Sequence, residues 1–167
     1  MKKEFYLKNV IAFNPKYAYS LAIPCILFWA AIYYFFIGTN FKLSFMMIFA
    51  LLCFVTMYFV MKLLSANVTL GIDKDYLYIK KNNQEEKYTK SDVVGFHTYN
   101  YDSVATQKKS ALRLEIKLVN GKKIFLDSIE GIDVDILITI VKTLQRELNF
   151  EIVERNKFNN KYWYSIK

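Results

Sequence analysis

Two long runs without a charged residue follow one another near the start of the chain. The first extends over residues 17–41 and the second over residues 43–61, and only Lys42 separates them. An α-helix needs about 20 consecutive apolar residues to cross the roughly 30 Å of hydrocarbon in a bilayer, and both runs are long enough. The pattern predicts a two-helix transmembrane hairpin over residues 17–62, with a very short turn on the outer side.

The first 16 residues mix charged and hydrophobic side chains. Lys2, Lys3, Glu4 and Lys8 are interspersed with aromatic and aliphatic residues, a composition typical of a segment that lies at the membrane interface. We therefore expect residues 1–16 to form a cytoplasmic interfacial segment that leads into the first span.

Beyond residue 65 the hydrophobic positions recur with a period of two, which is typical of β-strands. The clearest case is the segment ALRLEIKLV, residues 111–119, whose leucine and isoleucine side chains share one face. It is followed by Asn120-Gly121, the strongest short-range signal for a β-hairpin. We count six predicted strands between residues 67 and 127.

A helix and two more strands complete the pattern. Hydrophobic residues recur at helical spacing over residues 134–148, with Asp133 suited to cap the helix and Asn149 suited to end it. Strands are predicted at residues 150–153 and 162–166. Because six strands alone would leave an open edge, the last two favour a small eight-stranded β-barrel with one helix over residues 65–167.

The charge distribution refines the membrane topology. Of the net charge of +8, residues 1–16 carry +3 and the outer turn carries Lys42 alone. Positive segments beside transmembrane helices remain in the cytoplasm, so both termini are expected there. The abundance of Lys, Asn, Ile, Tyr and Phe points to an AT-rich bacterial genome, so we expect a multi-pass protein of the bacterial inner membrane.

The sequence carries no recognisable catalytic or metal-binding constellation. His97 is the single histidine, and both cysteines, Cys25 and Cys53, lie within the apolar runs. The acidic pair Asp133 and Asp135 lies at a helix start, where we interpret it as capping. Neither run contains an ionisable group of the kind that transporters use. We therefore predict no enzyme, no cofactor and no metal site.

With catalysis and metal binding set aside, the sequence offers a candidate ligand-binding face on the predicted strands. If the hydrophobic residues of each strand fill the interior, the alternate positions face outward. These positions carry tyrosines and basic residues, together with His97. Tyrosine stacks on nucleobases and arginine pairs with phosphate oxygens. The alternative is that tyrosines favour strands and cover a subunit interface. The candidate ligand-binding residues are Tyr76, Tyr78, Tyr99, Tyr101, Arg113 and Lys117.

The order and number of predicted elements resemble the transmembrane β-barrel effectors of bacterial CBASS antiphage systems. The resemblance covers essentially the whole chain and is one of architecture rather than of motif. It implies an antiviral effector whose cytoplasmic barrel binds a cyclic dinucleotide. Binding would drive oligomerisation, and the hairpins would then disrupt the inner membrane and kill the infected cell. The implied partners are the cyclic dinucleotide, the lipid bilayer and other copies of the chain, without DNA or RNA.

Two other classes of protein remain as alternatives. The chain also resembles bacterial pleckstrin-homology-like membrane proteins, which join a membrane hairpin to β-strands and a final helix. Residues 67–148 fit that pattern, whereas the strand-like tail departs from it. A membrane-embedded immunity protein that neutralises a toxin without a nucleotide ligand is the third class.

Overall fold

The computed structural model describes residues 3–14, 17, 20–38, 43–73, 75–82, 84–156 and 160–166. The chain divides into two units. Residues 1–13 and 65–167 form a mostly-β unit, here called the β-domain, and residues 14–64 form a helical hairpin.

The helical hairpin consists of α2 (Ala22–Ile37) and α3 (Leu43–Leu64). Trp29 donates a hydrogen bond from Nε1 to Oγ1 of Thr56 over 3.0 Å, and the rings of Tyr33 and Phe49 pack edge to face. Helix α3 is long and apolar enough to cross a membrane, and α2 is a shorter apolar helix. Two apolar helices were predicted here, and most of the predicted outer turn, residues 39–42, lies outside the described residues.

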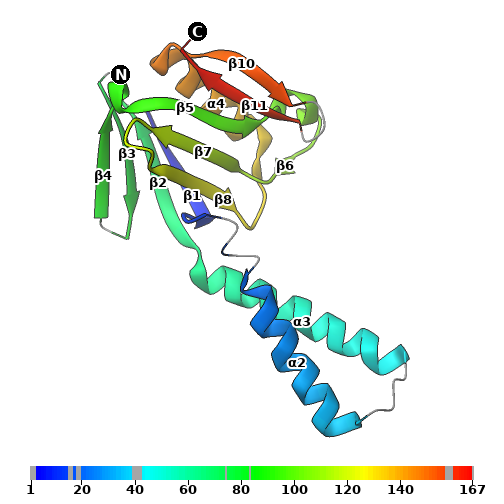
Figure 1. Ribbon diagram of the computed structural model, residues 1–167. Coiled ribbons are helices and arrows are strands. Elements are labelled where there is room, and N and C mark those ends of the chain that lie inside the picture. Colours follow the sequence, from blue (N-terminus) through cyan, green and yellow to red (C-terminus); the bar gives the residue numbers. More distant parts are fainter. Residues whose placement is uncertain are drawn as a thin grey trace. The chain divides into compact units, whose positions relative to one another are not determined.

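The β-domain contains a nine-stranded antiparallel sheet (Figure 1) with the order β10-β11-β5-β7-β8-β1-β2-β3-β4. Its strands are β1 (Lys3–Ile11), β2 (Ala66–Ile72), β3 (Tyr76–Lys81), β4 (Gln84–Thr89), β5 (Val93–Tyr99), β7 (Arg113–Leu118), β8 (Lys123–Ser128), β10 (Glu151–Asn156) and β11 (Lys161–Ser165). Short β6 (Lys109–Ser110) and β9 (Ile132–Asp133) pair separately, and 3₁₀ turns η1 (Lys90–Asp92) and η2 (Tyr101–Val104) flank β5. All six strands predicted before residue 127 are present.

Strand β1 corrects the prediction of an interfacial segment over residues 1–16. Leu7 and Val10 are buried in the core, and β1 pairs with both β2 and β8. The alternation is hidden in the sequence because a bulge lies between these two residues, with Asn9 at φ 52°. Asparagine tolerates this left-handed conformation. The bulge shifts the inward parity by one residue, so no simple period of two appears.

The position of β1 has a consequence for the hairpin. Val10 pairs with Ala66 across β1 and β2, so the 55 residues between them leave and re-enter the sheet at neighbouring positions. The helical hairpin is therefore an insertion between two adjacent strands of one domain, not an extension at its terminus.

The predicted closed barrel is not found. Among the described residues the sheet begins at β10 and ends at β4, and no pairing joins these two strands. Both end strands expose charged side chains, which protect an open edge from pairing with other chains. In Figure 1 strands β2, β3 and β4 run steeply while β5, β7 and β8 cross the view, so the sheet bends where β1 meets β8 through two residue pairs.

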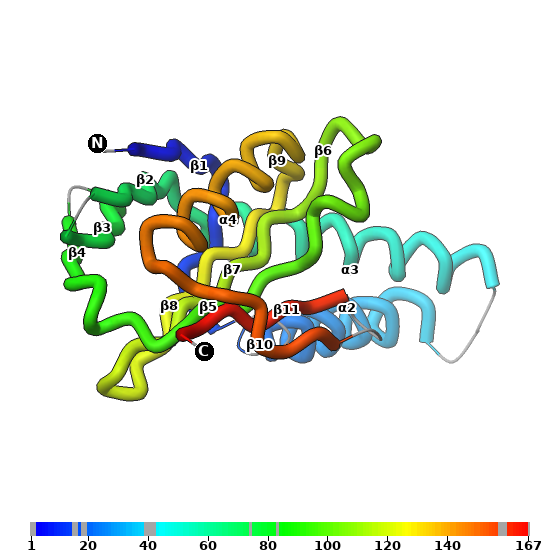
Figure 2. The backbone as a smooth tube through the Cα atoms, turned by 90° about the horizontal axis from the view of Figure 1, so that it is seen from above, coloured from blue at the N-terminus to red at the C-terminus, as the bar shows by residue number. Residues whose placement is uncertain are grey.

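Helix α4 (Val134–Leu148) covers the core side of the sheet (Figure 2). Asp133 caps it by accepting a hydrogen bond from the Asp135 amide, and Asn149 ends it at φ 55°, so both predicted boundaries are confirmed. Its buried stripe packs with strand residues in one hydrophobic core. The helix contributes Leu137, Ile140, Val141, Leu144 and Leu148 to this core.

The two tail strands are confirmed, but their position differs from the prediction. Strand β11 pairs with β5, and β10 forms the end of the sheet. Tyr164 stacks on Phe96 with ring centroids 4.6 Å apart, and Phe150 stacks on the same ring at 6.2 Å. The tail therefore completes the core instead of closing a barrel.

Two side-chain clusters tie distant parts of the sheet together. The Tyr78 ring lies over Gly71 and its hydroxyl donates to the Glu4 carboxylate, so one residue of β3 reaches across β2 to β1. On the open side, Lys122 of the β7–β8 turn donates 3.0 Å hydrogen bonds to both Glu86 and Tyr88 of β4. The Tyr78 contact ties three strands of one half of the sheet together, and the Lys122 contacts join the two halves beyond the β1–β8 junction.

Candidate functional site

Three of the predicted binding residues, Tyr99, Arg113 and Lys117, lie together on one surface of the sheet. This surface is formed by β11, β5, β7 and β8 and faces away from the core. We call this surface the outer face. Its register follows from the pairing of His97 with both Trp163 and Glu115, and of Gly95 with Lys117. The outer face consists of Lys161, Trp163, Ser165, Gly95, His97, Tyr99, Arg113, Glu115, Lys117, Lys123, Phe125 and Asp127.

Tyr99 and Arg113 form the most direct contact among the predicted residues. The guanidinium carbon lies 5.7 Å from the tyrosine ring centroid, and Nη1 donates to the tyrosine hydroxyl over 3.4 Å. The same guanidinium pairs through Nε with Oδ1 of Asp127 at 3.5 Å. Burial raises the pKa of Asp127, against the opposing charge of Arg113. Arg113 therefore already has a carboxylate partner, which a phosphate would have to compete with.

Glu115 organises the lysines at the centre of the outer face. Its carboxylate accepts from Lys123 at 2.8 Å and lies 3.5 Å from the ammonium of Lys161. Burial by itself raises the pKa of Glu115, but the hydrogen bond from Lys123 and the two positive charges outweigh it and hold the pKa below its ordinary value. Lys117 is exposed on the same strand, two residues along. Three ammonium groups thus share one face with two carboxylates, those of Glu115 and Asp127.

An aromatic platform borders this cluster. Trp163 lies over Gly95, where a β-carbon would come within 2.4 Å of the indole. His97 lies beside it, with ring centroids 4.3 Å apart. Burial lowers the pKa of His97, and the charge of Lys161 lowers it further. His97 is therefore neutral at pH 7 and adds a ring, not a charge, to the outer face.

The other predicted residues lie elsewhere. Tyr101 is buried, where its hydroxyl donates to the Ala111 carbonyl and accepts from the Arg113 amide, and burial raises its pKa. Tyr76 and Tyr78 belong to β3, in the other half of the bent sheet. Of these two, Tyr76 is exposed and Tyr78 is buried against Gly71. The predicted exposure is therefore wrong for Tyr78 and Tyr101, whereas Tyr76 faces outward as predicted but lies in the other half of the sheet.

Trp163, Lys123 and Lys161 were missed by the sequence analysis, although their strands were recognised. The alternation of side chains along each strand would have assigned them to the outer face only if the neighbouring strands of β11 were known. The tail was expected to close a barrel, and that expectation separated it from β5.

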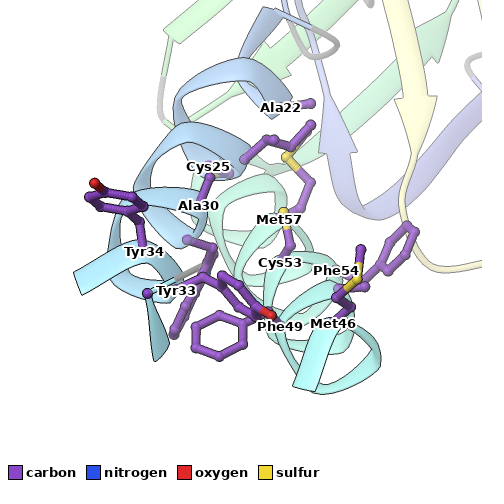
Figure 3. A pocket seen from close by; sticks show the side chains of 14 residues that line it. Ala22, Cys25, Ala30, Tyr33, Tyr34, Met46, Phe49, Cys53, Phe54 and Met57 are labelled. Atoms are coloured by element: carbon purple, nitrogen blue, oxygen red, sulfur yellow. The ribbon is translucent and has the colours of Figure 1, made fainter. Parts of the chain in front are cut away.

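The hairpin carries a second feature, an apolar groove of about 670 Å³ between α2 and α3 (Figure 3). Cys25 and Ala30 line it from α2, and Phe49, Cys53 and Met57 line it from α3. Tyr33 and Phe49 meet at one side of the groove. The small residues leave room for an acyl chain or another helix, and the lining offers no charged group.

No group of three or more His, Cys, Asp or Glu side chains suited to a metal ion occurs among the described residues. The outer face combines cations, an aromatic plane and two carboxylates, and its excess of cations suits reversible binding of an anion. Comparison with protein-family models, with curated proteins and with solved structures returns no match.

Proposed function

We propose that this chain is a membrane-anchored binding protein without catalytic activity, in which both apolar helices cross the bilayer and the β-domain binds a ligand on its outer face. The observation that carries the proposal is the insertion of the helical hairpin between the paired strands β1 and β2. Of the architectures that the sequence suggests, a pleckstrin-homology-like domain fits an open bent sheet followed by a helix better than a closed barrel does.

The insertion gives the hairpin a role beyond anchoring. Only Ser65 separates the end of α3 from the start of β2, and β1 ends at Ile11, ten residues before α2 begins at Ala22. The chain therefore enters and leaves the hairpin through the two strands of the β1–β2 ladder. Where this ladder has two arrangements, a ligand shifts the equilibrium between them only by its differential affinity for the two states, so binding and hairpin geometry influence each other reciprocally.

Membrane fractionation tests the anchoring. The full chain stays in the membrane fraction after an alkaline carbonate wash. A hairpin-deleted chain, in which residues 1–13 are joined to residues 65–167 by a short glycine-containing turn, is soluble and folded. If the full chain is released by carbonate, the membrane-spanning hairpin is refuted. If the hairpin-deleted chain is folded but remains with the membrane, the β-domain itself binds membranes and the anchoring role of the hairpin is refuted.

A second candidate is the antiviral effector that the architecture resembles, which would bind a cyclic dinucleotide and disrupt the inner membrane. It is favoured by the shared outer face of Tyr99, Arg113 and Lys117, and it is weakened by the absence of barrel closure among the described strands. Dye-loaded liposomes containing the chain test it. Leakage triggered by one cyclic dinucleotide supports it, and intact liposomes across a panel of cyclic dinucleotides that bind the chain exclude it.

A further inference from the structure

Sulfur-containing side chains are confined to the helical hairpin and the first residue of the chain. Apart from Met1, all six cysteines and methionines lie between residues 25 and 61, and residues 65–167 contain none. Four of the six line the groove between α2 and α3, namely Cys25, Met46, Cys53 and Met57. Methionine commonly fills gaps between apolar side chains, so the positions of these residues along the groove decide whether their sulfur atoms can act together.

Contacts between the two helices fix the level of Cys25 in the groove. Trp29 of α2 donates a hydrogen bond to Thr56 of α3. Tyr33 lies one turn later on α2 and packs against Phe49, which lies about two turns earlier on α3 than Thr56. The helices therefore run antiparallel, so a step backwards along α2 corresponds to a step forwards along α3. Cys25 lies one turn before Trp29 and is level with the part of α3 that begins near Thr56.

Two sulfur-containing residues of α3 lie close to this level. Met57 directly follows Thr56, and Cys53 lies one turn before Met57 on the same helix face, since residues four positions apart are neighbours on a helix. In Figure 3, Cys25 extends from α2, and Cys53 and Met57 extend from α3, into the same stretch of the groove. Met46 lies farther along α3. The other three side chains, Cys25, Cys53 and Met57, form what we call the sulfur cluster.

The chemistry of the lining limits which ligand the sulfur cluster can take. None of the described residues that line the groove is Asp, Glu or His, and hard cations such as Mg²⁺ and Ca²⁺ need oxygen ligands. Thiolate and thioether sulfur are instead the ligands that select Cu⁺. We propose that Cys25, Cys53 and Met57 form a Cu⁺-binding site inside the hairpin. This site is separate from the outer face and goes beyond the binding function proposed above.

Charge balance favours Cu⁺ in an apolar groove. One cysteine thiol releases its proton to water and its thiolate binds Cu⁺, so the complex is neutral and the oxidation state of copper is unchanged. The second cysteine and Met57 donate sulfur lone pairs without adding charge. Neutrality matters because a charge isolated from water in an apolar environment is costly. Zn²⁺ would need both thiolates for neutrality, and its usual sites contain at least three thiolate, imidazole or carboxylate ligands, of which the described lining supplies two.

Competition with a chromophoric Cu⁺ chelator measures affinity and stoichiometry for the reduced, full-length chain in detergent without oxygen. One equivalent of Cu⁺ is expected to bind, and Zn²⁺ is expected to bind at least tenfold more weakly. X-ray absorption of the parent complex should show only sulfur ligands on copper. Fluorescence locates the metal, because the chain contains two tryptophans, Trp29 in the groove and Trp163 in the β-domain. One equivalent of Cu⁺ should quench Trp29 in the Trp163→Phe variant and leave Trp163 unchanged in the Trp29→Phe variant.

Variants of the full-length chain test the three residues of the sulfur cluster. Cys25→Ser and Cys53→Ser, which replace a soft sulfur by a hydroxyl, should each weaken Cu⁺ binding at least tenfold. Met57→Leu should weaken it several-fold, because it removes the thioether in a swap that nearly conserves volume. Met47→Leu is the matched control on the same helix, because Met47 is 66% exposed and is not among the described lining residues of the groove. It should leave the affinity unchanged.

The proposal is overturned if no Cu⁺ binds, if copper has nitrogen or oxygen ligands in place of sulfur, or if Zn²⁺ binds as tightly. It is also overturned if either serine variant keeps the parent affinity, if Met47→Leu weakens binding as much as Met57→Leu, or if Cu⁺ quenches Trp163 and not Trp29. The X-ray absorption and fluorescence arms keep both cysteines, so they test the site even where a serine variant fails to fold. Carbonate-resistant membrane association requires no metal, so failure of the copper site and failure of the anchoring function are distinguishable.

Discussion

Deleting residues 1–13 is expected to unfold the rest of the β-domain, even though the whole hairpin separates these residues in sequence from its other strands. Strand β1 contributes Leu7, Val10 and Ile11 to the interior, with exposed fractions of 1%, 0% and 5%. Full burial of such side chains contributes about 1.5–3 kcal/mol each, or about 5–9 kcal/mol together. That loss is comparable to the entire stability of a typical domain, about 5–15 kcal/mol.

The position of β1 in the sheet adds to the effect. Among the described strands it alone pairs with both β2 and β8, so its removal separates the sheet into two parts and leaves two new edges. The expected result is that residues 65–167 alone lack a cooperative unfolding transition. The hairpin-deleted chain, which keeps residues 1–13, should unfold cooperatively, because Val10 and Ala66 are close enough for a short turn to join them.

Urea unfolding followed by circular dichroism, with amide NMR dispersion as a second measure, compares the two chains. Within the hairpin-deleted chain, Leu7→Ala is expected to cost about 2–5 kcal/mol. Tyr6→Ala is the matched control, because Tyr6 is 60% exposed on the same strand, and it should change stability by less than about 0.5 kcal/mol. A cooperative transition of residues 65–167 at the same urea midpoint would refute the structural role of β1.

Three further changes test the remaining contacts. Phe150→Ala should lower the free energy of unfolding by about 3–5 kcal/mol, measured in urea, because the tail residue is part of the core; an unaffected midpoint would contradict this. Gly71→Ala should cost about 1–3 kcal/mol, because its β-carbon would meet a tyrosine ring carbon at 1.9 Å; a variant as stable as the parent would show that the ring moves freely. Lys122→Met should cost about 0.5 kcal/mol near neutral pH. Hydrogen bonds from Tyr88 and Lys122 hold the pKa of Glu86 below its ordinary value, so the lysine's contribution is present above the unfolded pKa of Glu86 and lost as the pH falls through its folded pKa. The melting-temperature difference between Lys122→Met and the parent should therefore shrink in acid, and a difference that grows in acid would contradict the contact.

Periodicity predicted the elements of the β-domain well where a strand follows a strict period of two. Strand β7 is the clearest example, since Leu114, Ile116 and Leu118 are all buried as expected. The turn after it was equally predictable, because Gly121 adopts φ 80°, which the Asn-Gly pair favours. The capped helix α4 followed from the same kind of local signal.

Strand β1 shows where such reasoning fails. Its inward residues are Leu7 and then Val10, because Asn9 forms a bulge, and its partner strand lies beyond the hairpin in sequence. Neither the bulge nor a partner so distant leaves a periodic trace. Lysines near an apolar run then favour the interfacial interpretation, although Lys8 is simply on the exposed side of a strand.

The candidate site was predictable only in part for a related reason. Which residues share a face follows from parity within a strand, but which strands are neighbours does not. Tyr99, Arg113 and Lys117 belong to strands joined through the β5–β7 pairing, and they were grouped correctly. Trp163 was separated from them by the expected barrel closure, and Tyr76 was grouped with them although β3 lies four strands away from β7 in the sheet.

The outer face and the strands that carry the hairpin belong to opposite halves of the bent sheet, so any influence of a ligand on the helices has to pass through the contacts between those halves. The backbone link is short, since β8 meets β1 only at Ser128 with Val10 and at Asp127 with Ile11. Asp127 is also the partner of Arg113 on the outer face. One carboxylate therefore contacts a cation of the candidate site and lies opposite the last residue of the strand that enters the hairpin. A phosphate that drew Arg113 away from Asp127 would change the charge balance at this junction. The β1–β8 junction therefore gives a short hydrogen-bonded route from the outer face to the strand that enters the helical hairpin.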